Sequence, residues 1–396
     1  MHFIGADQLH GFRKRLTSDI VPADFIWACY DLDENGERKV PRGAYYRRYK
    51  TPDVGPRVTS INMRYDEETH FRALQYLALR GEIPEDPFLL LVSYHHPHEP
   101  FYAPREFWDM YEGEEIEIPE YPENLEETYS TMDKWLNRWH GVDSGDIKEP
   151  DSLRALRRAY YAAVSYVDRK VGELVYSLEQ NGLLENTIIV FTSDHGDMLG
   201  ERGMVQKRSF YEWSTRIPLI IRFPDGMGRG TKIKEPVSLI DVTPTVLDMA
   251  GIKEAVRCPV DGKSLMGLIS GDAEPDRDVF SEHHTEAVES PCFMIRRGSY
   301  KYIMIHGHES LLFDLEQDPG EWNNLSGRED LGEKEYDLRQ RILEQFDPDE
   351  INRGIIVGMK RKKVIRDAMI ANDTHWDYSP VFEPTLLYVR QKKGQS

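Results

Sequence analysis

Cysteine is scarce in this chain, with three in 396 residues. An odd number of widely spaced cysteines does not support a disulfide framework, so the sequence predicts a reducing compartment, and we expect the protein to be cytoplasmic. Long apolar runs are missing as well, because no stretch is long enough to cross a bilayer and no signal-peptide core follows Met1. We therefore expect no association with a membrane.

Positive charge is in the minority. The chain has 50 Lys and Arg against 69 Asp and Glu, a net charge of −19. Nucleic acids are bound through clustered Lys and Arg that contact phosphates, so we expect no nucleic-acid partner. The acidic balance fits a zwitterionic or cationic small molecule better than a bare anion. With 40% hydrophobic residues the chain can bury a substantial core, which predicts one large α/β domain with a smaller appendage.

Apolar and amphipathic segments alternate along most of the chain, which is typical of an α/β domain. The expected helices span residues 66–79, about 152–178, the segment from 242 and 334–345. The expected strands of the main sheet span 88–94, 187–191 and 217–223, and short antiparallel strands follow at 279–282, 292–296, 301–305 and 311–315. Acid-rich, proline-spaced residues 104–150 are expected to form a surface excursion with little regular structure.

The most informative segment is Thr192 to Gly203, directly behind the apolar strand 187–191. Asp194 and His195 are expected at the carboxyl end of a buried parallel strand, where open α/β sheets place their ligands. A carboxylate and an imidazole there suit a divalent cation, and Lys207 twelve residues beyond His195 suits an anionic substrate group. The alternative interpretation is a polar strand-to-loop turn with an acidic cap.

The pattern Ser193-Asp194-His195-Gly196-Asp197, followed by Lys207, resembles the metal segment of the sulfatases in the alkaline phosphatase superfamily. Other stretches resemble choline sulfatases in particular, in the order in which they occur there: residues 1–12, 17–25, 92–100 and 361–390. The resemblance implies an alkaline phosphatase-like core with a mostly parallel sheet flanked by helices. It divides the chain into a catalytic domain at 1–270, an antiparallel sheet-and-helix subdomain at 271–346 and a tail at 347–396.

The resemblance also implies roles for individual residues. The metal ligands would be Asp194 and His195, the catalytic residues His2, His96 and Lys207, and the residues around a substrate ammonium group Trp27, Glu286 and Asp377. The metal is expected to be Ca²⁺, with Mn²⁺ or Mg²⁺ as alternatives. His95 and His98 are instead expected to cap a turn. The segment Ala28 to Asp31 departs from the choline sulfatase pattern, which has a second tryptophan there.

Sulfatases of this type carry a nucleophile in the pattern Cys/Ser-x-Pro-x-Arg, oxidised to formylglycine, and this chain contains no such pattern. We therefore expect the nucleophile segment to lie upstream of Met1, and this chain alone to be inactive. Its open sheet edge would then favour aggregation or pairing, in line with an expected homo-oligomer. Three functions remain open: hydrolysis of a sulfate monoester such as choline sulfate, hydrolysis of a phosphonate or phosphate ester, and a non-catalytic binding or assembly role.

Overall fold

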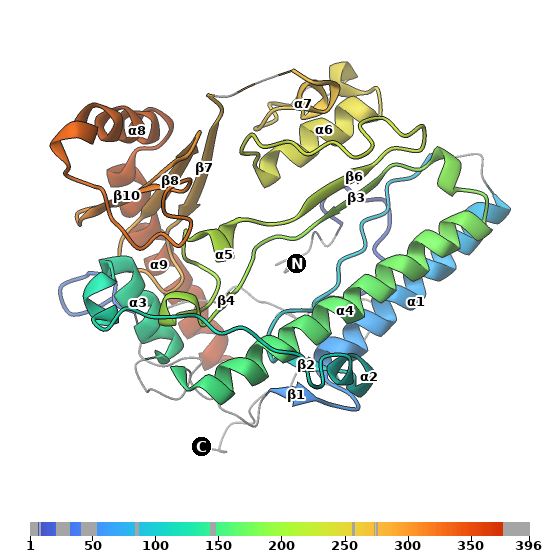
Figure 1. The fold of residues 1–396 in the computed structure, drawn as a ribbon, viewed down its shortest axis with the longest axis horizontal. Helices are drawn as coiled ribbons and strands as arrows, with labels where there is room; N and C mark the ends of the chain where they lie inside the picture. Colours follow the sequence, from blue (N-terminus) through green and yellow to red (C-terminus); the bar gives the residue numbers. More distant parts are fainter. Residues whose placement is uncertain are drawn as a thin grey trace.

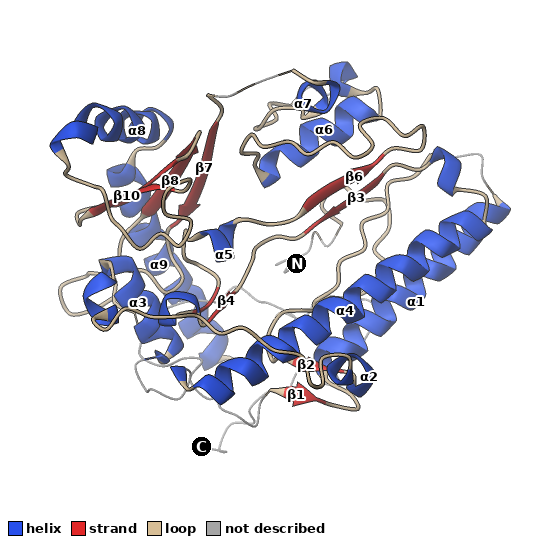
Figure 2. Ribbon diagram, viewed as in Figure 1, coloured by secondary structure: helices blue, strands red, loops and turns tan. Residues whose placement is uncertain are grey.

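The structure is a computed structural model that describes residues 7, 9–20, 32–40, 54–83, 87–142, 148–255, 258–272, 274 and 276–374. Two long helices form one side of the molecule, a four-stranded sheet lies on the opposite side, and a two-stranded ribbon runs between them (Figures 1 and 2). Among the described helices, none combines the length and the hydrophobicity that a bilayer crossing requires.

The two long helices are α1 (Ile61–Glu82) and α4 (Pro150–Gln180), and they lie side by side (Figure 1). Helix α1 begins earlier than predicted because the Ser60 hydroxyl accepts a hydrogen bond from the Met63 amide and caps the helix. Helix α4 has Pro150 in its first turn, where a backbone amide hydrogen would have no partner within the helix. Glu67 of α1 joins the helices by accepting hydrogen bonds from Tyr166 and Lys170 of α4.

The central ribbon consists of β3 (Ile189–Thr192) and β6 (Leu219–Arg222), which pair antiparallel. The prediction of a mostly parallel sheet is therefore wrong for this pair, because the chain reverses direction in residues 193–218 before it returns beside β3. Parallel pairing among the described strands occurs between β1 (Gly55–Pro56) and β2 (Tyr102–Ala103). The segment 88–94, predicted as a strand, is extended but pairs with no described strand.

Residues 104–150 are not the irregular surface excursion that the sequence predicted. They contain α2 (Arg105–Asp109), the 3-10 turn Leu125–Thr128 and α3 (Thr131–His140). Trp135, Leu136 and Trp139 of α3 are buried in the largest core cluster. This amphipathic helix was missed in the sequence because acidic loops flank it. Its N-terminus is closed by a capping box between Ser130 and Asp133.

Several further elements among the described residues are short. The short hairpin is formed by β4 (Met198–Leu199) and β5 (Val205–Gln206). The other short helices are α5 (Glu212–Thr215), α6 (Val242–Met249) and α7 (Met266–Ser270), with 3-10 turns at Leu184–Asn186, Glu201–Gly203, Leu239–Asp241, Lys253–Ala255 and Glu329–Leu331.

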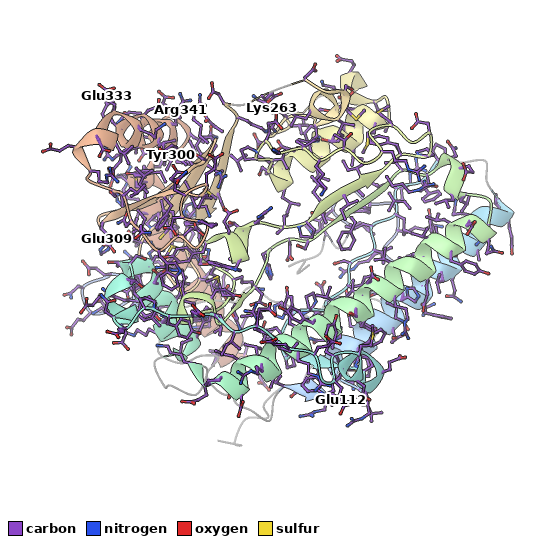
Figure 3. The ribbon with its side chains drawn as sticks, in the orientation of Figure 1. Glu112, Lys263, Tyr300, Glu309, Glu333 and Arg341 are labelled. Atoms are coloured by element: carbon purple, nitrogen blue, oxygen red, sulfur yellow. The ribbon has the colours of Figure 1, made fainter. Side chains whose placement is uncertain are left out.

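The C-terminal half contains the antiparallel sheet that the short strands predicted. It is formed by β7 (Asp278–His283), β8 (Cys292–Arg297), β9 (Tyr300–Ile305) and β10 (Ser310–Asp314), in the order β10-β9-β8-β7. Helix α8 (Gly332–Gln345), which carries Arg341 (Figure 3), covers one face. Arg341 donates a hydrogen bond to Asp278 of β7. Helix α9 (Pro348–Ala371) lies within the region predicted as a tail.

Side chains alternate between the two faces of this sheet, as the pleat of a strand requires. One face buries Phe293, Ile295, Tyr302 and Leu312 with Leu338 and Ile342 of α8. The other buries Met294, Ile303 and Phe313 with α3 and the β4–β5 hairpin. The sheet thereby supports the β4–β5 hairpin through this shared core.

Candidate active site

Lys207 directly follows the β4–β5 hairpin, whose first strand begins four residues after Asp194. In this hairpin Met198 of β4 pairs with Gln206 of β5. The residue after β5, Lys207, therefore lies beside His195, which precedes β4. Gln206 and Arg208, which flank Lys207, have φ values of 65° and 83°. Non-glycine residues in this left-handed region are held there by their surroundings, which fixes the backbone on both sides of Lys207.

The Lys207 ammonium group lies between two imidazole rings. Its Nζ is 2.9 Å from His98 Nε2 and 3.0 Å from His195 Nε2. The Nδ1 atom of each ring faces carbonyl or carboxylate oxygens, and therefore carries a proton that it donates. Both Nε2 atoms consequently present lone pairs that accept from Lys207, which leaves its third N–H for another acceptor.

Glu99 orients the His98 ring. Its carboxylate Oε2 lies 2.9 Å from His98 Nδ1, and that nitrogen also donates to the Glu99 backbone carbonyl at 2.8 Å. Burial opposes the charge of Glu99, but the hydrogen bond from His98 and the positive charges of Lys207 and Arg208 outweigh it and lower the pKa of Glu99 to about 2. A carboxylate is therefore fixed behind the ring that contacts Lys207.

Asp194 and His195 adjoin this cluster on the solvent side. The Asp194 side chain is 83% exposed, and its Oδ2 lies 3.5 Å from His195 Nε2. Burial, and then the charge of Lys207, lower the pKa of His195, which favours the neutral ring that metals require. Lys207 donates to the Nε2 lone pair that a cation would need, so a cation bound there would displace Lys207 from His195.

These two groups fit neighbouring positions of a divalent-cation shell. An exposed carboxylate oxygen and an imidazole lone pair 3.5 Å apart can bind one ion. Within the part of the chain that the structure describes, no group of three or more His, Cys, Asp or Glu side chains gathers to hold a metal ion. The described residues thus supply part of a shell, and a complete one needs further oxygen ligands.

A comparison with family models decides the affiliation of this site. The model described as Sulfatase matches residues 9–252, and the model described as N-sulphoglucosamine sulphohydrolase, C-terminal, matches residues 200–347. The first match covers more than half of the chain and includes Asp194, His195 and Lys207. The chain belongs to the sulfatase family.

Curated relatives agree with the family. This sulfatase is 37% identical to a choline-sulfatase of Rhizobium meliloti (strain 1021) over 98% of its own length and 77% of that protein. It is 33% identical to an arylsulfatase of Clostridium perfringens (strain 13 / Type A) over 68% of its length and 55% of that protein. The chain thus spans about three quarters of the first relative and about half of the second.

Solved structures show the same fold. The sulfatase matches a crystal structure of a sulfatase from Bacteroides fragilis with a TM-score of 0.56 at 25% identity, covering 70% of this chain and 57% of the other. It matches a phosphonate monoester hydrolase from Silicibacter pomeroyi with a TM-score of 0.61 at 24% identity, covering 80% and 66%. The α/β fold of the alkaline phosphatase-like sulfatases is therefore established for this chain.

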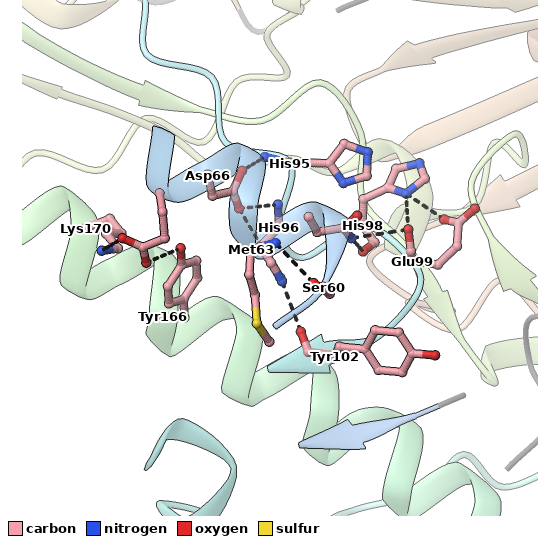
Figure 4. Close-up of polar contacts among 12 residues, drawn as sticks. Ser60, Met63, Asp66, His95, His96, His98, Glu99, Tyr102, Tyr166 and Lys170 are labelled. Atoms are coloured by element: carbon pink, nitrogen blue, oxygen red, sulfur yellow. Dashed lines mark hydrogen bonds and ion pairs between the residues drawn. The ribbon is translucent and has the colours of Figure 1, made fainter. Parts of the chain in front are cut away.

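His96, the histidine that the sequence favoured for catalysis in this sulfatase, is held by groups other than Lys207. It is 4% exposed, its Nδ1 is 2.5 Å from Asp66 Oδ2 of α1, and its Nε2 is 3.0 Å from the Tyr102 carbonyl (Figure 4). Both ring nitrogens are thus occupied by protein groups. His98, which the sequence predicted as a turn cap, is the histidine that the fold brings to Lys207.

The other predicted residues are only partly placed. His2, Trp27 and Asp377 lie outside the described residues, so their roles stay predictions. Glu286 is described and partly exposed, but its carboxylate is already paired with Arg208. The structure therefore brings Asp194, His195 and Lys207 together and adds His98 and Glu99. The signal for these two was their place in the sequence His96-Pro97-His98-Glu99-Pro100, next to the histidine that the sequence favoured.

Acid is expected to destabilise this sulfatase through His140, which is 1% exposed. Burial, followed by the charge of Arg208, lowers the pKa of His140 to about 3, so the folded state keeps the ring neutral. Below about pH 6.5 the unfolded chain binds the extra proton, and unfolding free energy falls as pH falls towards 3, by up to about 1.4 kcal/mol per pH unit.

Urea unfolding between pH 6.5 and 4 measures this slope. His140→Leu replaces the titrating ring with an apolar side chain of similar size. In the variant, the unfolding free energy is expected to fall less steeply with falling pH, by up to about 1.4 kcal/mol per pH unit, which corresponds to one proton. Identical slopes for the variant and the wild type would show that His140 is not the cause.

Proposed function

We propose that this chain belongs to an enzyme that hydrolyses sulfate monoesters of the choline sulfate type, and that Lys207, His98 and His195 form its sulfate-binding site. The observation that carries the proposal is the Lys207 ammonium group, held 2.9 Å and 3.0 Å from two imidazole nitrogens beside an exposed carboxylate. A fixed cation with one N–H that no described residue takes up is suited to a sulfate oxygen. The 37% identity to a choline-sulfatase supports the substrate class.

The reaction adds water to the ester and cleaves the S–O bond, so that sulfate and an alcohol are formed. The charge of Lys207 would stabilise the sulfate oxygens as negative charge develops on them. The departing alcohol oxygen takes up a proton, and the Lys207 ammonium group, oriented by His98 and His195, would supply it. Asp194 and His195 would hold a divalent cation, which neutralises charge and activates the oxygen nucleophile when it is bound.

Several finer expectations belong to this proposal. A formylglycine nucleophile is what the resemblance implies for the full family and not for this chain. Calcium as the metal, a homo-oligomeric state and a cytoplasmic location are expectations from the sequence that are consistent with the proposal. The same holds for His2 as a sulfate contact and for Trp27 and Asp377 around the ammonium group. His96 is retained as a buried support for its segment, because Asp66 and Tyr102 occupy both of its ring nitrogens.

The second candidate is a phosphonate or phosphate ester as substrate. A relative 29% identical over 81% of this chain is a multifunctional alkaline phosphatase superfamily protein of Trinickia caryophylli. Sulfate and phosphoryl groups both carry negatively charged oxygens around a tetrahedral centre. A lysine held between two histidines can bind the oxygens of either group. A role in binding or assembly without catalysis is the third candidate.

Calorimetric titration of the chain separates these candidates. Choline sulfate and inorganic sulfate are expected to bind, and phenylphosphonate to bind more weakly. Tighter binding of phenylphosphonate would favour the second candidate, and no binding of any of these ligands would contradict both hydrolytic proposals.

The chain alone is expected to turn over neither 4-nitrophenyl sulfate nor a phenylphosphonate ester above background, because its sequence holds no Cys/Ser-x-Pro-x-Arg nucleophile. The release of 4-nitrophenol checks this directly. Turnover that disappears in the Asp194→Ala variant would refute the prediction of inactivity and would place the metal ligand in a working site.

A further inference from the structure

Arg208 follows Lys207 and reaches a carboxylate that lies far along the sequence. Its Nε and Nη2 atoms donate to the same oxygen, Glu286 Oε2, at 3.0 Å and 2.9 Å. Its Nη1 donates to Gln206 Oε1 at 2.8 Å. The Arg208 side chain is 8% exposed and that of Glu286 is 27% exposed, so the pair lies at the edge of the site with the carboxylate nearer to solvent.

The pair is electrically coupled to the sulfate-binding cluster. Burial, and then the charge of Arg208, lower the pKa of Lys207, and Arg208 also acts on Glu99 and His140. The loop that carries Glu286 is anchored by His283, whose Nε2 lies 2.6 Å from the Glu286 carbonyl. Glu286 is thereby held on Arg208, the residue that follows the lysine that would bind sulfate.

Pairing changes what Glu286 can offer to a substrate. The sequence assigned this carboxylate to a cationic head group, but a carboxylate that accepts two hydrogen bonds from a guanidinium is largely neutralised toward a second cation. Removal of Arg208 would expose that negative charge, and removal of the Glu286 charge would leave Arg208 to repel a cation. The two side chains therefore have opposite electrostatic effects on a cationic group bound beside them.

We propose that Arg208 is a specificity-determining residue that sets how strongly the site prefers cationic over neutral alcohol groups, by holding Glu286 in an ion pair. The inference rests on the proposed sulfate-ester function and deepens it. It places the control of head-group charge in the residue next to the sulfate-binding lysine. Selectivity is then a balance between two opposite charges, and each has its own measurable effect.

The test compares two esters of the same shape and different charge, choline sulfate and the neutral 3,3-dimethylbutyl sulfate. Calorimetric titration of the chain gives the Kd of each, and the readout is the ratio of the neutral to the cationic ester. Any loss of sulfate affinity common to both esters cancels in this ratio. Arg208→Gln is expected to raise the ratio about fivefold and Glu286→Gln to lower it about fivefold.

Further variants separate charge from packing. Arg208→Lys keeps the charge and is expected to leave the ratio close to that of the wild type. The double variant Arg208→Gln with Glu286→Gln removes both charges and should restore the ratio. Arg297→Gln is the matched control, because it breaks a comparably exposed ion pair with Asp278 on the C-terminal sheet, with side chains 23% and 22% exposed. It is expected not to change the ratio.

The outcomes distinguish the inference from the function on which it rests. Shifts of opposite sign for the two single variants support the inference. Binding of both esters with an unchanged ratio in both variants overturns the inference alone. If Arg208→Gln does not fold, the isosteric Glu286→Gln variant decides by itself, and an unchanged ratio overturns the inference. Failure of inorganic sulfate and both esters to bind the wild type overturns the proposed function as well.

Discussion

Replacement of Lys207 by methionine is expected to weaken the binding of sulfate and of sulfate esters by about ten- to a hundredfold. The side chain keeps its length but loses the ammonium group that lies 2.9 Å from His98 and 3.0 Å from His195. Charge-assisted hydrogen bonds of this kind contribute about 1.5–3 kcal/mol each, so Kd should rise by about ten- to a hundredfold. Calorimetric titration with inorganic sulfate measures the change without any need for turnover.

The matched control for this experiment is Lys170→Met. Lys170 is also a largely buried lysine, with a side chain 12% exposed, but it pairs with Glu67 between the two long helices. We expect this variant to keep the affinity for sulfate. Equal losses in both variants would mean that net charge, and not the position of Lys207, determines binding. An unchanged Kd in Lys207→Met would refute the site itself.

Lys301→Met is expected to lower the free energy of unfolding more than any other single variant proposed for this protein. Lys301 and Glu321 are both fully buried, with 2.8 Å between Nζ and Oε1, and Lys301 also contacts Glu212 and the Phe210 carbonyl. Without the cation, Glu321 would remain charged and unpaired in the core, or would take up a proton. Breaking a buried pair from one side costs about 3–5 kcal/mol.

Urea unfolding at pH 7 measures this loss. The double variant Lys301→Met with Glu321→Gln should recover part of it, because the amide oxygen still accepts the hydrogen bond that the Glu212 amide donates to Glu321. A single-variant loss below about 1 kcal/mol, or no recovery in the double variant, would show that the two charges are not coupled as the distance implies. The pair matters for the site because Phe210 and Glu212 directly follow the Lys207 segment.

Many elements of the fold were predictable from periodicity. Helix α4 and the strands β7 to β10 occur where the spacing of apolar residues placed them. Helix α3 was missed because its flanks are acidic and rich in proline, although Trp135 and Leu136 are core residues. The pairing direction of β3 and β6 was also wrong, since an apolar run indicates burial and carries no information about the direction of its neighbour.

The sequence by itself determined the chemistry of the central segment. Asp194, His195 and Lys207 lie within fourteen consecutive residues, and a hairpin between them suffices to bring them together. Their residue types indicated an anionic substrate and a divalent cation before any contact was known.

Only the tertiary structure decided which distant groups join them. His98 lies 109 residues from Lys207 and Glu286 lies 78 residues from Arg208, and no local pattern encodes such distances. Two histidines of one segment have different partners, because His96 bonds to Asp66 of α1 (Figure 4). His98, two residues further on, meets Lys207. Burial then fixes which nitrogen or carboxylate is paired, because polar groups removed from water must find partners in the fold.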